Sequence, residues 1–101
     1  MILKYAKNII NEESIALKKL SASLNNKFIE AVKIISTIKG NTIITGVGKS
    51  GFIAKKIAST MISTGTPAIF IHPTEASHGD LGLIQKKDSL IILSKSGKSK
   101  E

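Results

Sequence analysis

The stretch NTIITGVGKSG, residues 41–51, decides the fold of this chain. Residues 41–45 are β-branched and mostly apolar, which is typical of a strand buried in a parallel sheet. The glycines of residues 46–51 indicate a tight turn, and the apolar spacing that follows predicts a helix from about Phe52 to Thr64. A strand, a turn and a helix in this order form the first unit of an open α/β sheet.

Two further apolar runs, residues 68–71 and 88–93, predict a second and a third strand. The polar, glycine-containing residues 72–82 between them predict a loop with room for one helical turn. The three strands in this order are most simply parallel.

Upstream of the sheet, apolar residues at three- and four-residue steps predict an amphipathic helix over about residues 3–23. Asn25 or Asn26 is placed to cap a second helix, which we expect Gly40 to end as a left-handed residue. The expected fold class is therefore α/β. A helical hairpin over residues 1–40 leads into the first half of a doubly wound parallel sheet over residues 41–101.

The chain has 101 residues, which is the size of one domain, with 15 Lys, no Arg, no Cys and a net charge of +8. Seven Lys and three acids fall in residues 1–40, and eight Lys and four acids fall in residues 41–101. This dispersed charge and the absence of Arg argue against a nucleic-acid partner. No apolar run reaches the roughly 18–20 residues of a membrane span, so we expect a cytoplasmic protein with no membrane partner.

The glycine-rich turn fits the pattern G-x-G-x-x-G, which lets a backbone approach a ligand and offers helix N–H groups to an anion. A Walker loop would need glycine at position 43, which is Ile43. A dinucleotide site expects an acid at the end of the second strand, where residues 71–73 read IHP. A sugar-phosphate site and a turn without a ligand remain as alternatives.

A second loop of suitable chemistry, SKSGKS at residues 94–99, follows the third strand. Hydroxyls and turn N–H groups together can hold a phosphate, because each gives a donor to a tetrahedral anion. Ligands of open α/β sheets bind beyond the carboxyl ends of the strands. We therefore expect this loop and the glycine-rich turn to face one crevice.

Four segments, GVGKSG at 46–51, STGTP at 63–67, HPTEASHGDLG at 72–82 and SKSG at 94–97, closely resemble the sugar isomerase (SIS) domain. Within it they resemble the arabinose-5-phosphate isomerase family, which interconverts D-ribulose 5-phosphate and D-arabinose 5-phosphate. The resemblance covers the chain from about residue 41 onward. It implies a sugar-phosphate partner, aldose–ketose isomerisation, no cofactor and a homo-oligomer.

The resemblance also implies roles for individual residues. Lys49 matches the active-site lysine of the family and Glu101 a glutamate important for activity, so we expect them to be a charge stabiliser and a general base. The alternatives are a solvated lysine and a frayed terminal glutamate. The expected substrate and phosphate contacts are Gly48, Ser50, His78, Ser94, Ser96 and Ser99. His72 is expected to order its loop, and the two histidines with their neighbouring acids lack a recognised metal spacing.

The chain departs from the family pattern at Lys98, where the family has Glu, and at Lys100, where a small polar residue is common. Family members continue with more strands, helices and catalytic acids and histidines. The resemblance therefore predicts an N-terminal fragment, truncated after the third strand, and leaves open whether it is an active enzyme. The alternatives are a non-catalytic module that senses a phosphosugar and an inert pseudogene product.

Overall fold

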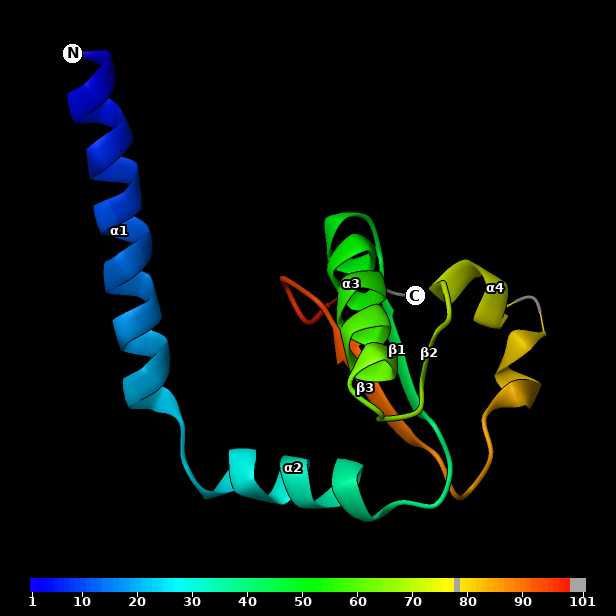
Figure 1. Ribbon diagram of the computed structural model, residues 1–101. Helices are drawn as coiled ribbons and strands as arrows, with labels where there is room; N and C mark the ends of the chain where they lie inside the picture. Colours follow the sequence, from blue (N-terminus) through cyan, green and yellow to red (C-terminus); the bar gives the residue numbers. More distant parts are fainter. Residues whose placement is uncertain (78, 99–101) are drawn as a thin grey trace. The chain divides into compact units, whose positions relative to one another are not determined.

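The computed structural model describes residues 1–77 and 79–98, and the chain divides into two compact units, Met1–Val32 and Lys33–Glu101. Helix α1 (Ile2–Ser23) lies in the first unit (Figure 1). Helix α2 (Asn26–Thr37) begins in the first unit and ends in the second. In the described part of the chain, no helix is both long and apolar enough to cross a bilayer.

The two N-terminal helices lie where the apolar spacing predicts them. The expected cap of the second helix is also confirmed, because the side-chain oxygen of Asn25 accepts the backbone N–H of Lys27 at 2.9 Å. This bond satisfies one of the N–H groups that the first turn of a helix leaves without a partner.

The second unit contains a parallel sheet, which has three strands among the described residues. Its strands are β1 (Thr42–Gly46), β2 (Ala68–Phe70) and β3 (Ser89–Leu93), in the order β2-β1-β3. β1 pairs with β3 over its full length, from Thr42 opposite Ser89 to Gly46 opposite Leu93. The expected α/β fold class with a parallel sheet is confirmed, and the carboxyl ends of the strands lie at one edge.

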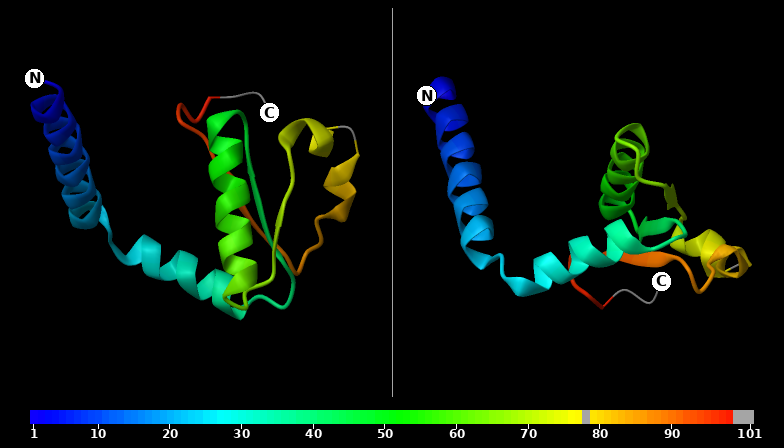
Figure 2. Two further views of the ribbon diagram at one scale, coloured as in Figure 1. Left: turned by 45° about the horizontal axis from the view of Figure 1, so that its top comes forward. Right: turned by 60° about the horizontal axis from the view of Figure 1, so that its bottom comes forward.

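Helix α3 (Lys49–Ser63) packs along one face of this sheet, as the views of Figures 1 and 2 show. The contact is built from small residues, since Ala54 and Ala58 of the helix are buried against Ile44 and Ala68 of the strands. Alanine lets a helix approach a sheet closely, and the surrounding larger apolar side chains close the gaps. These side chains belong to Ile57, Met61, Phe70, Ile91 and Leu93.

The glycines of the turn between β1 and α3 are required for different physical reasons. Gly48 adopts φ +60°, a conformation that side chains disfavour. Gly46 and Gly51 touch each other, because a Cβ on Gly51 would lie 2.6 Å from the carbonyl oxygen of Gly46. The helix begins at Lys49, earlier than the expected Phe52, so Lys49 and Ser50 belong to its first turn.

The expected role of Gly40 as the left-handed end of the second helix is wrong. α2 ends at Thr37, and Gly40 does not have a positive φ. Its N–H donates to the carbonyl of Lys87 at 3.1 Å, and a Cβ on Gly40 would lie 2.7 Å from that oxygen. Gly40 is required by the close approach of the chain before β3, a constraint that leaves no local mark in the sequence.

Asp88 joins the segments that enter β1 and β3. Its carboxylate accepts the backbone N–H groups of Asn41 and Gln85, each at 2.8 Å. These bonds, with a smaller contribution from Lys87, lower the pKa of the Asp88 carboxyl below its ordinary value. The charged carboxylate is therefore the form that the fold prefers.

The loop between β2 and β3 contains the helical turn that its composition allows. It forms α4 (Pro73–Ser77) and then a 3₁₀ helix, Asp80–Leu83. The Nδ1 atom of His72 accepts the N–H of Thr74 at 3.1 Å, so His72 orders the start of α4 as expected. Its ring also meets Phe70 edge-on, with 6.5 Å between the centroids.

The contact between Gly46 and Gly51 can be tested by Gly51→Ala. Alanine raises helix propensity by about 1 kcal/mol, but the methyl group overpacks a backbone contact at a cost of about 1–3 kcal/mol. We expect a lower urea midpoint of unfolding. Gly82→Ala is the control, because a Cβ there meets nothing within 4 Å. Equal midpoints for the two variants would contradict a close backbone contact between Gly46 and Gly51.

The Asp88 linkage predicts a pH dependence of stability. Because its pKa is lower in the folded than in the unfolded chain, the carboxylate stabilises the fold above the unfolded value of about 3.9. This stabilisation is lost as the pH falls through that value and below. Urea unfolding between pH 3 and pH 7 should show a smaller fall in stability for Asp88→Asn than for the unaltered chain. Parallel curves would exclude Asp88 as the cause.

Candidate functional site

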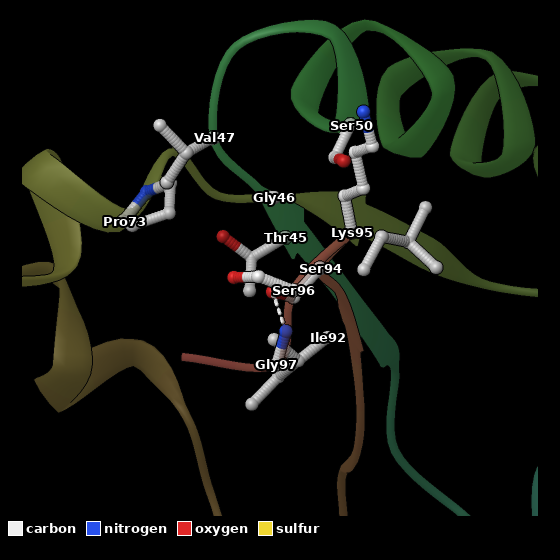
Figure 3. Close-up of a pocket in the computed structure, with 11 residues that line it drawn as sticks. Thr45, Gly46, Val47, Ser50, Pro73, Ile92, Ser94, Lys95, Ser96 and Gly97 are labelled. Atoms are coloured by element: carbon white, nitrogen blue, oxygen red, sulfur yellow. Dashed lines mark hydrogen bonds between the residues drawn. The ribbon is translucent and has the colours of Figure 1, made fainter. Parts of the chain in front are cut away.

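A cleft of about 780 Å³ lies beyond the carboxyl ends of the strands, within the range of small-molecule sites. Its wall includes Thr45 of β1, Ile92 of β3 and Pro73, the first residue of α4 (Figure 3). The remaining lining residues come from the ends of β1 and β3, from the turn before α3, from its first turn and from the loop after β3. They are Gly46, Val47, Ser50, Leu93, Ser94, Lys95, Ser96 and Gly97.

The loop after β3 presents two serine hydroxyls at the cleft. The Oγ atom of Ser94 accepts the N–H of Gly97 at 2.8 Å, and the Oγ atom of Ser96 accepts the N–H of Lys98 at 3.1 Å. Gly97 closes this turn with φ +71°. Each hydroxyl is held as an acceptor, so its own hydrogen remains able to donate to a ligand. Such a pair of donors suits an anion.

The start of α3 gives the cleft a second group of donors. Gly48 occupies the N-cap position and makes no side-chain cap, and the first turn of α3 contains no acidic residue. The first N–H groups of a helix have no partner within it, and the helix dipole places a partial positive charge there. Ser50 lines the cleft from this turn. The helix start is thus suited to an anion that the chain itself does not provide.

Thr45 fixes the edge of the cleft where β1 and β2 end. Its Oγ1 atom donates to the carbonyl of Ile71, the residue after β2. The N–H of Ile71 in turn donates to the carbonyl of Ile44 at 3.1 Å. These bonds hold the chain that enters α4 against β1, so Pro73 forms a fixed part of the wall.

The structure brings together three of the residues predicted to contact the phosphate, since Ser50, Ser94 and Ser96 all line the cleft. Gly48 precedes Ser50 in the turn and does not line it. Lys49 is the exposed first residue of α3 and also does not line it. The predicted residues His78, Ser99 and Glu101 lie outside the described residues.

Eight lining residues were not among the predicted site residues: Thr45, Gly46, Val47, Pro73, Ile92, Leu93, Lys95 and Gly97. Lys95 could have been predicted, because it stands in the SKSG segment between two residues that were predicted to contact the phosphate. The place of Pro73 follows only from the parallel order of the strands, which brings the end of β2 to the same edge. Among the His, Asp and Glu side chains that the structure describes, no three gather as a metal site.

Known proteins resemble this chain over most of its length. Residues 34–101 match the profile of the SIS domain family. Arabinose 5-phosphate isomerase KdsD of Pseudomonas aeruginosa is 45% identical over 96 residues, which are 95% of this chain and 29% of KdsD. Arabinose 5-phosphate isomerase GutQ of Salmonella typhi is 51% identical over 83 residues, which are 82% of this chain and 26% of GutQ. The resemblance expected from the motifs is confirmed.

A solved structure also matches, that of an Escherichia coli CFT073 protein in complex with arabinose 5-phosphate. It superposes with a TM-score of 0.90 at 40% identity, and the match covers 97% of this chain and 52% of that chain. The present chain therefore spans less than a third of the length of these curated relatives and about half of this structural neighbour.

Proposed function

Because the chain belongs to the SIS domain family of phosphosugar isomerase relatives, we propose that its cleft binds the phosphate of a pentose 5-phosphate. The main support for this proposal is that two groups of hydrogen-bond donors lie at one cleft. The hydroxyls of Ser94 and Ser96 lie on one side, and Ser50 with the uncapped start of α3 lies on the other. A tetrahedral anion can accept from both groups at once, which a planar carboxylate does less well.

The proposed reaction is the interconversion of D-ribulose 5-phosphate and D-arabinose 5-phosphate. It moves a proton between adjacent carbons through an enediol, so it needs a base near the carbon and a positive group near the developing oxyanion. We assign the base to Glu101 and the positive group to Lys49. The position of Lys49 separates it from the proposed phosphate contacts. It is the first residue of α3, next to the cleft residue Ser50, and it does not itself line the cleft.

Binding of the phosphate can be tested by Ser94→Ala and Ser96→Ala. A hydrogen bond to a charged group contributes about 1.5–3 kcal/mol, so each variant should weaken binding of arabinose 5-phosphate roughly ten- to a hundred-fold in calorimetric titration. Ser36→Ala is the matched control, since the exposed Ser36 hydroxyl donates only to the carbonyl of Lys33 within α2. If all three variants bind equally well, the serine loop does not hold the phosphate.

The assigned chemistry is tested by incubating the chain with ribulose 5-phosphate and measuring arabinose 5-phosphate. We expect Lys49→Gln to lower conversion about a hundred-fold, as does removal of one oxyanion donor, while the Kd changes by less than about three-fold. Loss of binding in proportion would place Lys49 on the phosphate instead. Saturable binding without any conversion by the unaltered chain would favour a phosphosugar-sensing module, and no binding would overturn the proposal.

A further inference from the structure

Lys95 is a cleft residue to which the proposed reaction gives no role. It stands between Ser94 and Ser96, and its side chain extends toward the start of α3, where Ser50 lies (Figure 3). Among the side chains that the structure describes, it is the lysine that lines the cleft, and no carboxylate does so. The Lys95 charge therefore has no carboxylate to offset it among the described side chains of the cleft wall.

The charges at the cleft fit those of a phosphate ester. At neutral pH a phosphate monoester carries about −1.5 to −2 charges. The start of a helix contributes the equivalent of about +0.5 charge, and the Lys95 ammonium contributes one more. Hydroxyls supply donors but no charge, so the serines and α3 alone would leave most of the phosphate charge unbalanced.

We propose that Lys95 is a phosphate-contacting residue of this cleft and the side chain that makes its affinity for sugar phosphates depend on charge. This proposal rests on the proposed function, because it assigns the cation for the same bound phosphate. The ammonium group is carried on a flexible stem by the residue between the two serines, so it can meet a phosphate oxygen without moving the loop that Gly97 closes. Lys49 then remains free for the reacting end of the sugar.

The chain offers a matched control for this proposal in Lys98. It lies in the same loop, three residues from Lys95, is exposed and does not line the cleft. Only its backbone N–H takes part in the loop, by donating to the Oγ atom of Ser96. Lys95→Gln and Lys98→Gln therefore remove the same charge from neighbouring positions, and both leave the backbone bonds of the loop intact.

The experiment is a calorimetric titration of the full chain and both variants with arabinose 5-phosphate at several salt concentrations. We expect Lys95→Gln to weaken binding about ten-fold at low salt and to reduce the dependence of the Kd on salt, because screening acts on the lost charge pair. Lys98→Gln should change the Kd by less than about two-fold. Circular dichroism of each variant checks that the fold is retained.

The possible outcomes distinguish the role of Lys95 from the proposed function of the cleft. If the unaltered chain binds and Lys95→Gln behaves like Lys98→Gln in both affinity and salt dependence, Lys95 does not contact the phosphate, and the proposed function still stands. If both variants lose affinity equally, the effect is one of net charge, and the assignment to Lys95 is also overturned. If the unaltered chain does not bind at all, both proposals fail.

Discussion

The contact of Gly46 with Gly51 is the constraint on which the site depends. The end of β1 and the third residue of α3 touch backbone to backbone, with no room for a Cβ between them. A side chain at either position would push the start of the helix away from the strand. Because the two stay in contact, the first N–H groups of α3 are held at the carboxyl edge of the sheet. The turn thus places the helix start beside the loop after β3.

The parallel register supplies the other half of the cleft. β1 and β3 are paired as far as Gly46 and Leu93, so the serine loop begins directly beside the glycine-rich turn. At the other side of β1, the Thr45 hydroxyl holds the residue that follows β2. Segments that are far apart in the sequence therefore meet at one edge. Two of these segments, the start of α3 and the serine loop, offer hydrogen-bond donors, and among the described side chains no carboxylate lines the cleft.

The strands, the helix between them and the two loops could be predicted because their signals are local. β-branched runs, apolar periodicity and glycine clusters report the conformation of the residues that carry them. Gly40 shows where this approach fails. A glycine shortly after a helix is typical of a left-handed end, yet here it is required by residues 87 and 88, far along the chain. The position of Pro73 at the cleft likewise depends on strand order, which the sequence indicates only indirectly.

The net charge of +8 can now be separated into parts with different physical meanings. Most lysines are dispersed, and their number alone is no evidence for a partner. Lys49 and Lys95 differ from these because both stand near the positive end of α3, where a cation is unfavourable in the free protein. An arrangement that is unfavourable when empty becomes favourable when an anion neutralises it, and the gain appears as binding affinity. The first turn of α3 also lacks the acidic residues that would stabilise an isolated helix, and a fixed carboxylate there would compete with the proposed phosphate.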